Sequence, residues 1–293
     1  MSKVVLMQGL IASGKSTRAK ELTQEIGNVV RLNRDLLRTM LHFDKWTGIN
    51  EQKTIEAQIL LARKFLADNT SVIIDDTNLS LRTVERWKTI AKETGSKFEI
   101  VKMDTSLEEC LKRDQHREKR VGHDVIMKMA MQFGMYKPAS GYIICDLDGT
   151  ICDLTKRLHY VKGEGKKDWK KFFEELSHDD PRVDVVIKVN YLIGKNLYDL
   201  VFVSGRPEEY RHLTEEWFMR NLPGLWKIRT ALIMRSSGDK RDDDVVKKDI
   251  LEKYFLDKSL VKVVLDDRPR IIRMWKDNLP DAEICDVGDG IEF

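Results

Sequence analysis

The sequence predicts an α/β protein made of two domains, each with a parallel sheet covered by helices. Short apolar strands alternate with amphipathic helices through both halves of the chain, which is the order typical of such sheets. The length of 293 residues is sufficient for two domains with separate cores. The Pro, Ser and Gly of residues 137–141 are typical of a linker. We therefore expect a first domain over residues 1–139 and a second over residues 140–293.

The first half is expected to contain strands at residues 4–7, 28–32, 71–78 and 97–103, separated by helices. Asn50 is the expected cap of one helix, and Ser106 with Glu109 has the spacing of a capping box at the start of another. In a parallel sheet, ligands bind beyond the carboxyl ends of the strands. The functional residues are therefore expected at these ends.

One glycine-rich segment, VVLMQGLIASGKST over residues 4–17, contains an apolar strand and precedes a helix. It fits the pattern G-x-x-x-x-G-K-[ST], whose backbone N–H groups surround the phosphates of a nucleoside triphosphate. The lysine of this pattern reaches the β- and γ-phosphates, and the hydroxyl of Ser16 is placed to bind Mg²⁺. The expected triphosphate contacts are Gly9, Ser13, Gly14, Lys15, Ser16 and Thr17.

Charged residues also follow two other strands of the first half. Asp35 comes after strand 28–32 and shares a helical face with Arg38, while Asp75 and Asp76 end the third strand. The sheet geometry predicts that they meet the glycine-rich segment in one crevice. The basic run KRDQHREKR over residues 112–120 is interpreted as a mobile lid over the phosphates, with a solvated helical face as the alternative.

The second half begins with an apolar strand that leads into DLDGT at residues 146–150. Two carboxylates this close repel each other unless a cation lies between them or one is protonated. An ordinary Asp-Gly turn is the alternative. Later strands end in SGR at residues 204–206 and DD at residues 266–267. Carboxylate, hydroxyl and guanidinium groups at strand ends indicate a pocket for Mg²⁺ and phosphate, over which the polar region 150–180 is a candidate cap.

Both halves resemble known families. The DLDGT string is similar to the motif of haloacid-dehalogenase-type phosphatases, and nearly the whole chain resembles the bifunctional polynucleotide 5′-kinase/3′-phosphatase of tailed phages. The resemblance implies a P-loop kinase domain followed by a haloacid-dehalogenase-like domain of Rossmann-like type, with ATP as phosphoryl donor and Mg²⁺ as metal. The strings that carry it, in the family's order, are GLIASGKST, LNRDLLR, IIDDTNL, LDGT, VSGRP, DDDVVK and LDDR.

For the kinase, the resemblance implies that Asp35 takes the proton from a 5′-hydroxyl while Lys15 stabilises the transferring phosphoryl group. Arg38 is implied to contact the phosphate of the acceptor, and Asp76 to support that site. Arg117 is the matched lid arginine and is implied to contact the ATP phosphates.

Two assignments stay open. Asp75 stands beside Asp76 where the phage pattern has a small residue, so either carboxylate is a candidate for the kinase site. The lid segment aligns with a one-residue gap, which leaves Arg113, Arg117 and Arg120 as candidates for the lid arginine.

For the phosphatase, the resemblance implies that Asp146 attacks a 3′-phosphate to form an aspartyl-phosphate, with Asp148 as general acid and then base. Arg157 is implied to contact the nucleic acid. The residues implied to hold the phosphate are Ser204, Gly205, Arg206 and Lys247. The residues implied to bind Mg²⁺ in this half are Asp146, Asp148, Asp266 and Asp267.

The expected function is therefore end healing of DNA or RNA, by phosphorylation of 5′-hydroxyl ends and removal of 3′-phosphates. A kinase/phosphatase of small molecules or nucleotides is one alternative, because the motifs mostly recognise phosphate. A nucleotide-gated nucleic-acid-binding module is another, against which the intact motif residues argue.

The composition also bears on whether the chain is a membrane protein or a secreted protein. No apolar window approaches the ~20 residues that a membrane helix needs. The first strand leaves no room for a signal peptide, and the four cysteines lack C-x-x-C spacing and are expected to be reduced. We expect a cytoplasmic protein (in the host cytoplasm if phage-encoded), and the phage resemblance implies a homo-oligomer.

Overall fold

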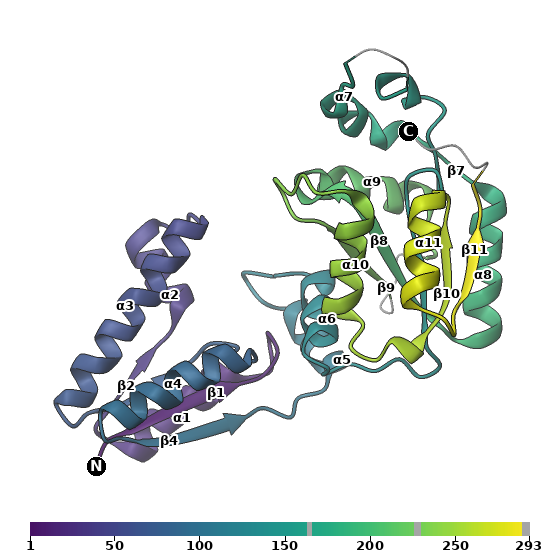
Figure 1. Cartoon of the computed structure of the whole chain (residues 1–293). Helices are drawn as coiled ribbons and strands as arrows, with labels where there is room; N and C mark the ends of the chain where they lie inside the picture. Colours follow the sequence, from purple (N-terminus) through teal and green to yellow (C-terminus); the bar gives the residue numbers. More distant parts are fainter. Residues whose placement is uncertain (163–165, 226–229, 289–293) are drawn as a thin grey trace. The chain divides into compact units, whose positions relative to one another are not determined.

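The computed structural model describes residues 1–162, 166–225 and 230–288. The chain divides into two compact units, Met1–Ile126 and Met127–Phe293, and Figure 1 labels the helices and strands of both. The division lies within a helix upstream of the predicted linker, and a domain boundary after residue 139 stays a prediction.

The N-terminal unit is built on a parallel sheet with the strand order β2-β3-β1-β4. Crossover helices join successive strands, as expected for a parallel sheet. The elements of this part are β1 (Lys3–Gln8), α1 (Lys15–Ile26), β2 (Val29–Leu32), α2 (Arg34–His42), α3 (Gly48–Ala67), β3 (Ser71–Ile74), α4 (Leu81–Glu93), β4 (Lys97–Lys102) and α5 (Leu107–Asp114). The division between the two units falls within α6 (His123–Gln132).

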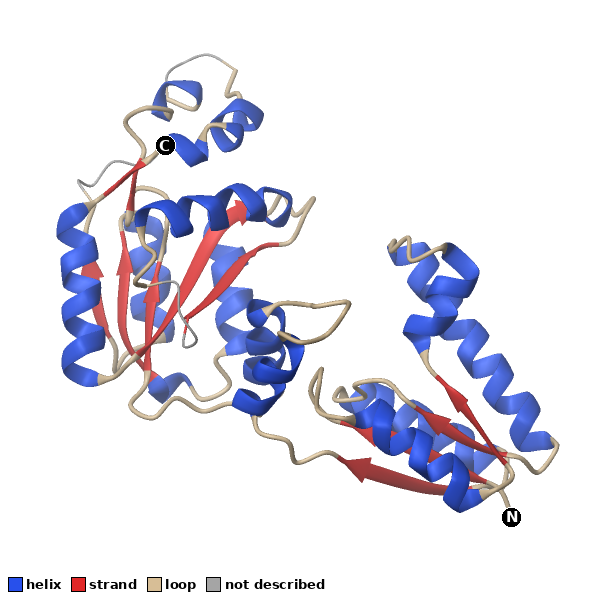
Figure 2. Cartoon of the chain, turned by 180° about the vertical axis from the view of Figure 1, so that it is seen from behind, coloured by secondary structure: helices blue, strands red, loops and turns tan. Residues whose placement is uncertain are grey.

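Both faces of this sheet are buried, because alternate residues of a strand point to opposite sides. On one face, Val4 and Leu6 of β1 pack against α3 and α4. On the other, Val5 and Met7 pack against α1. The sheet therefore lies between two helical layers (Figure 2).

Of the two helix caps predicted from the sequence, one is confirmed and the other is wrong. Ser106 accepts a hydrogen bond from the backbone N–H of Glu109 at 3.2 Å, which confirms the predicted cap of α5. The prediction for Asn50 is wrong, because α3 already begins at Gly48 and its cap is Thr47. The Thr47 hydroxyl accepts from the N–H of Asn50 at 3.0 Å, so Asn50 supplies the N–H group that is capped and not the cap itself.

The C-terminal unit contains a second parallel sheet, with the order β11-β10-β5-β8-β9. Its elements are β5 (Tyr142–Cys145), β6 (Cys152–Asp153), η1 (Leu158–Tyr160), α7 (Trp169–Glu174), η2 (Leu176–His178), β7 (Asp180–Pro181), α8 (Val183–Asn196), β8 (Asp199–Pro207), η3 (Glu208–Tyr210), α9 (Arg211–Asn221), β9 (Thr230–Arg235), α10 (Asp243–Tyr254), η4 (Lys258–Leu260), β10 (Val261–Asp266), α11 (Pro269–Asn278) and β11 (Glu283–Asp286).

Helices also cover both faces of the second sheet. Side chains of β5, β8 and β10 pack with those of α8 and α9 on one face. Helices α10 and α11 contact β8 and β10 from the other. The central strand β5 lies between β8 and β10, so polar residues that follow these three strands are neighbours. The predicted α/β class is confirmed.

A segment inserted after β5 forms the predicted cap. We call residues 152–181 the cap segment, of which 163–165 lie outside the described residues. Its ends pair as the antiparallel strands β6 and β7, and Leu154, Val161 and Phe172 form a small core of its own. The cap segment is thus a separate hydrophobic layer joined to the sheet by two neighbouring strands.

Two expectations from composition can be compared with the described residues. The four cysteines are free and buried, as expected for reduced thiols. No described helix has the combination of length and apolar sequence that a bilayer crossing requires.

Candidate active sites

The glycine-rich loop between β1 and α1 has a backbone that requires its glycines. Gly9 has φ +158° and Gly14 has φ +92°, conformations that other residues rarely adopt. A Cβ at Gly9 would lie 2.8 Å from Ser13 Oγ and 2.9 Å from Met103 Cβ. Gly14 immediately precedes α1, and the free N–H groups of a helix start attract anions. The loop therefore has the geometry of a phosphate cradle.

Lys15 is buried at the inner wall of this loop. Its ammonium donates to the carbonyl oxygens of Gly9 at 3.1 Å and Leu10 at 2.5 Å. Burial lowers the pKa of Lys15 to about 8, against the opposing effect of the nearby Asp75 carboxylate. The lysine is therefore held by its own loop in a position that faces the pocket.

A pocket of about 710 Å³ joins the loop to the ends of β2 and β3. The structure thus brings together the three segments that were predicted to converge. Among the described residues that line it are Ser13, Gly14, Lys15, Ser16, Thr17, Asp35, Arg38, Asp75, Asp76, Arg113 and Arg117.

Asp75 and Asp76 have different surroundings. Asp75 pairs with Arg31 on the neighbouring strand β2, at 2.5 Å between Arg31 Nη2 and Oδ2. Asp76 accepts from the backbone N–H of Arg34 at 2.9 Å and from the Gln58 amide at 2.8 Å. It also pairs with the Arg34 guanidinium. Asp76 therefore fixes the start of α2, the helix that carries Asp35.

Asp35 and Arg38 lie on one face of α2, as the three-residue spacing predicts. Arg38 donates to Asp35 Oδ1 at 2.7 Å and to Glu51 Oε2 at 2.7 Å. The Asp35 side chain is 81% exposed, so it is accessible to an acceptor hydroxyl. Glu51, on α3, holds the guanidinium of Arg38 in place. Glu51 was not among the predicted residues, because no sequence motif links α3 to α2.

The predicted lid segment contributes two arginines to the pocket wall. Arg113 pairs with Glu109 at 2.7 Å and Arg117 with Asp114 at 3.3 Å. Arg120 is not among the described residues that line the pocket. Of the three candidates for the lid arginine, Arg113 and Arg117 line this pocket, and the choice among the three stays a prediction.

The second pocket has Asp146 at its centre, directly after β5. Lys247 of α10 places its ammonium 2.8 Å from Asp146 Oδ1 and 2.8 Å from Asp266 Oδ2. Burial raises the pKa of Asp146 well above its usual value, and the charge of Lys247 opposes this. The pKa of Lys247 is also raised. Burial by itself would lower this pKa, but the negative charges of Asp146 and Asp266 stabilise the ammonium and raise the pKa by more.

Three carboxylates in this pocket fit a divalent cation. Ligand atoms of Asp146, Asp266 and Asp267 lie within 4.8 Å of one another. Burial and Asp266 raise the pKa of Asp267 to about 6, as expected for carboxylates that repel one another in the absence of a cation. Oxygen donors in such a cluster suit Mg²⁺. Asp148 was predicted as a fourth ligand but, among the described residues, does not belong to this cluster.

The carboxylate of Asp148 is held by two arginines instead. Arg206 Nη2 lies 2.6 Å from Asp148 Oδ1, and Arg157 donates to the same oxygen. Burial would raise the pKa of Asp148, but Arg157 and Arg206 lower it well below its usual value. Asp148 is therefore paired with the two arginines and not grouped with the three carboxylates of the metal cluster, and this pairing favours its ionised form.

Arg157, which was expected to contact nucleic acid, lies inside the C-terminal unit. It is fully buried, pairs with Asp179 at 2.6 Å and lies 4.1 Å from the ring centroid of Phe172. In this structure it therefore links the cap segment to Asp148 and does not present its guanidinium to solvent. Asp179, a partner from the end of the cap segment, has no sequence signal that would have identified it.

The predicted phosphate-holding residues lie around Asp146. Ser204 and Arg206 are buried at the end of β8, and Gly205 lines the pocket. A Cβ at Gly205 would overlap the carboxylate of Asp243, so a larger residue there would displace the Asp243 side chain.

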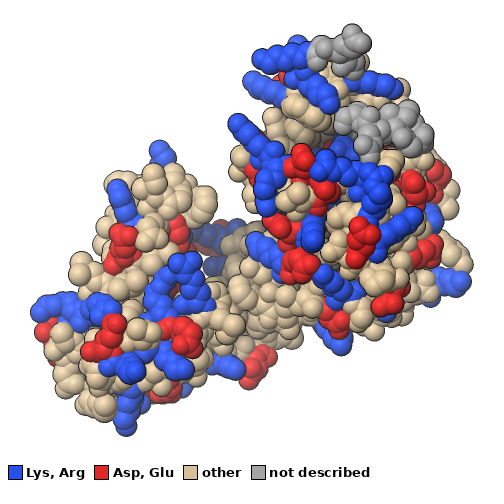
Figure 3. All heavy atoms as spheres, viewed as in Figure 1, with Lys and Arg blue, Asp and Glu red and all other residues tan. Residues whose placement is uncertain are grey.

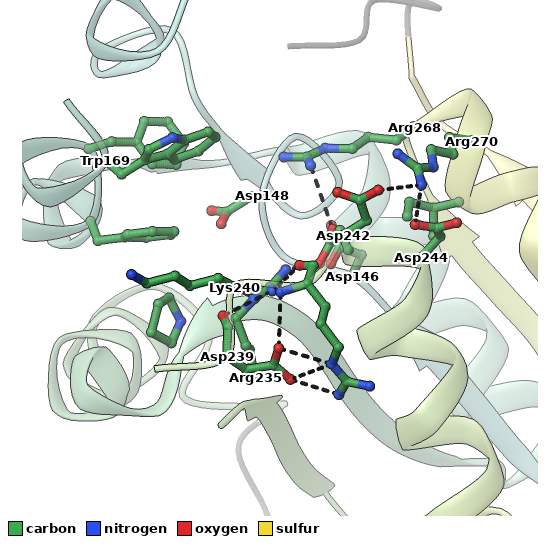
Figure 4. A pocket seen from close by; sticks show the side chains of 17 residues that line it. Asp146, Asp148, Trp169, Arg235, Asp239, Lys240, Asp242, Asp244, Arg268 and Arg270 are labelled. Carbon is green, nitrogen blue, oxygen red and sulfur yellow. Dashed lines mark hydrogen bonds and ion pairs between the residues drawn. The ribbon is translucent and has the colours of Figure 1, made fainter. Parts of the chain in front are cut away.

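Sequence reasoning missed Asp243 and the arginines around it. Asp243 pairs with Arg235 at 3.1 Å and with Arg268 at 3.6 Å, and all three line the pocket. Figure 4 shows Arg235 and Arg268 in the pocket with Asp146 and Asp148. The string DDDVVK could have identified Asp243, since it stands one helical turn before Lys247.

The fold and the two pockets define a two-domain α/β protein with a triphosphate-type loop in one unit and a carboxylate-centred phosphate pocket in the other. Residues 4–135 match the family described as AAA domain. Residues 140–290, just over half of the chain, match the family described as polynucleotide kinase PNKP phosphatase domain, and the chain belongs to this family. The predicted order of a P-loop domain followed by a haloacid-dehalogenase-like domain is confirmed.

Individual relatives extend over most of the chain. It is 29% identical over 302 residues to the "Putative bifunctional polynucleotide kinase/RNA ligase" of Autographa californica nuclear polyhedrosis virus, covering 94% of this chain and 41% of that protein. It therefore spans less than half the length of that relative. It is 23% identical to the L-seryl-tRNA(Sec) kinase of Methanococcus maripaludis, covering 88% of this chain and 99% of the relative.

Among solved structures, a chain of the Pnkp1/Rnl/Hen1 complex is similar to this one. The identity is 25%, the coverage is 99% of this chain and 98% of that chain, and the TM-score is 0.42.

Proposed function

We propose that this protein heals nucleic-acid ends, by transferring the γ-phosphate of ATP to 5′-hydroxyl ends and by hydrolysing 3′-phosphate ends. The observation that carries the proposal is the pairing, in one chain, of a phosphate-cradling loop beside Asp35 with a nucleophile pocket around Asp146. The family of the second half and the name of the viral relative agree with a polynucleotide substrate.

The proposed kinase works by positioning and charge neutralisation. Asp35 accepts the proton of the 5′-hydroxyl, and its exposure gives the acceptor access. Arg38 holds the acceptor's phosphate, Lys15 stabilises the transferring group, and Arg117 closes over it as the lid. Asp76 supports the site by fixing the start of α2. Mg²⁺, for which Ser16 is the proposed ligand, would neutralise charge on the triphosphate.

The proposed phosphatase uses a covalent intermediate. A carboxylate oxygen of Asp146 attacks the phosphorus and the bond to the 3′-oxygen breaks. Asp148 gives that oxygen a proton, which in this proposal it takes up from water once the bound substrate has separated it from Arg157 and Arg206. Water then attacks the aspartyl-phosphate after losing a proton to Asp148, which releases inorganic phosphate and restores Asp146. Ser204, Gly205, Arg206 and Lys247 surround the phosphate oxygens in this proposal.

Mg²⁺ at Asp146, Asp266 and Asp267 would offset negative charge on the phosphate and the nucleophile. The close approach of three carboxylates supports this assignment. Chelation is expected to stop phosphate release, and added Mg²⁺ to restore it.

The test is transfer of radiolabelled γ-phosphate from ATP to matched DNA and RNA oligonucleotides with 5′-hydroxyl ends, with 3′-phosphate release measured in parallel. Free nucleosides are added as competitors. Competition by nucleosides as strong as by oligonucleotides would favour a small-molecule kinase. Nucleotide-dependent binding without turnover of either end would favour a binding module and refute the proposal.

The proposal includes a homo-oligomer in the cytoplasm. Light scattering of the purified chain measures the first, and fractionation of the producing cell measures the second. A monomer at all concentrations would remove the oligomer from the proposal without affecting either activity.

A further inference from the structure

An aromatic stack stands at one side of the Asp146 pocket. Trp169 of the cap segment lies at 6.1 Å and 25° to the ring of Phe173, which in turn lies at 5.2 Å and 30° to Tyr210. Phe172 meets the edge of Trp169 at 5.6 Å. Trp169 therefore has a fixed orientation set by two neighbouring rings.

Packing of the cap segment does not explain why Trp169 is exposed. Phe172 fills the small core of this segment and is buried, whereas Trp169 is 41% exposed and lines the pocket. A large aromatic ring held rigidly at the wall of a pocket is typical of a binding surface for a planar ligand. Phe172 and Phe173 also line the pocket, but Phe172 is buried, so its ring is less accessible to a ligand than that of Trp169.

The same cavity contains the reacting carboxylates. Asp146, Asp148 and Trp169 line one pocket of about 700 Å³. Figure 4 draws Trp169 on the opposite side of the pocket from Arg268 and Arg270, with Asp148 between them. A substrate whose phosphate reaches Asp146 therefore has the rest of its terminal nucleotide inside the same cavity as the indole.

The surface around Trp169 is basic. Lys162, Lys166, Lys167, Lys170 and Lys171 are all exposed. The ammonium of Lys167 lies 5.6 Å from the centroid of the Trp169 ring. Figure 3 shows Lys and Arg side chains gathered over the part of the C-terminal unit that contains α7. Aromatic rings combined with a positive surface are the usual means of binding single-stranded nucleic acid.

We propose that Trp169 stacks against the terminal nucleobase of the 3′-phosphorylated strand, while the lysines around it face the backbone phosphates. This inference rests on the proposed phosphatase function and names the part of the substrate that the cap segment holds. The stacked base touches no reacting atom, so its contribution is expected in KM and not in kcat.

The experiment measures phosphate release from two oligodeoxynucleotides that differ only at the 3′-terminal nucleotide, which carries either a normal base or an abasic sugar. Both end in a 3′-phosphate. The proteins are the unaltered full chain, Trp169→Ala, Trp169→Phe and the control Tyr191→Ala, an exposed aromatic of α8 outside the pocket lining.

We expect the abasic end to raise KM of the unaltered protein about 5- to 150-fold, the range of one base–aromatic stack, with kcat little changed. Trp169→Ala should raise KM for the normal end by a similar factor and show no further effect of the abasic end. Trp169→Phe and Tyr191→Ala should remain close to the unaltered protein.

Equal KM values for the two oligonucleotides in the unaltered protein would overturn the stacking proposal, and this comparison does not depend on any variant folding. The proposal would also be overturned if the abasic end raised KM of Trp169→Ala by as much as it raises KM of the unaltered protein. Absence of phosphate release from both oligonucleotides would refute the proposed phosphatase function instead.

Discussion

The two pockets hold their charges in different ways. In the N-terminal unit the proposed base, Asp35, is largely exposed, and Arg113 and Arg117 pair with residues four and three positions before them in the chain. In the C-terminal unit, Asp146 and Asp148 are buried and bound to side chains from other elements. Asp35, Arg113 and Arg117 are therefore able to rearrange around a substrate, whereas Asp146 and Asp148 are held in place by packing.

This difference has a physical basis. A buried carboxylate loses its hydration and is stable only when paired or hydrogen-bonded. An exposed one is solvated and needs no partner. Substitutions in the C-terminal pocket should therefore change both chemistry and stability, and those in the N-terminal pocket mainly chemistry.

The largest effect is expected for Asp146→Asn, because an amide cannot act as the nucleophile. Release of 3′-phosphate should fall by about 10⁴-fold or more, with 5′-phosphorylation unchanged. Both activities are measured on one preparation. Loss of both together would contradict two independent sites.

Asp35→Asn should reduce 5′-phosphorylation by about 10²- to 10⁴-fold, the usual contribution of a general base. The side chain is exposed, so thermal unfolding should not change. Asp68→Asn, an exposed carboxylate at the far end of α3, is the matched control. A fall in the unfolding temperature of Asp35→Asn would show that the charge also supports the fold.

Asp179→Asn should destabilise the C-terminal unit by about 3–5 kcal/mol, because it breaks a buried ion pair with Arg157. Denaturant unfolding measures the loss, and retained 5′-phosphorylation shows that the other unit is intact. Asp75→Asn is the comparison in the N-terminal unit. Arg31, the partner of Asp75, is partly exposed to solvent, so Asp75→Asn should lower the free energy of unfolding by less than Asp179→Asn does. Equal losses would contradict the contrast between the two pockets.

Asp267→Asn should raise the Mg²⁺ concentration for half-maximal phosphate release by about tenfold or more, because a carboxylate of the proposed metal cluster is lost. The Mg²⁺ dependence of 5′-phosphorylation should not change. A titration of both activities with Mg²⁺ checks this, and an unaltered phosphatase curve would remove Asp267 from the site.

Local sequence predicted the parts of each site that lie within one strand end and the turn after it. The loop from Gly9 to Ser16, the pair Asp35 and Arg38, and the string from Asp146 to Asp148 are set by spacing along the chain. Residues that complete these sites from other elements were not predicted. Glu51 orients Arg38 from α3, and nothing in the sequence of α3 indicates this.

The chain's own order of residues thus determined the α/β class, the phosphate-cradling loop and the aspartates at the strand ends. Strand ends of a parallel sheet lie at one edge, so their convergence follows from the fold class. The tertiary structure decided which charges meet. It assigned Asp148 to Arg206 and Arg157, and it turned Arg157 away from solvent. The reason is that burial forces each charge to find a partner, and the available partners depend on packing between elements that are distant in sequence.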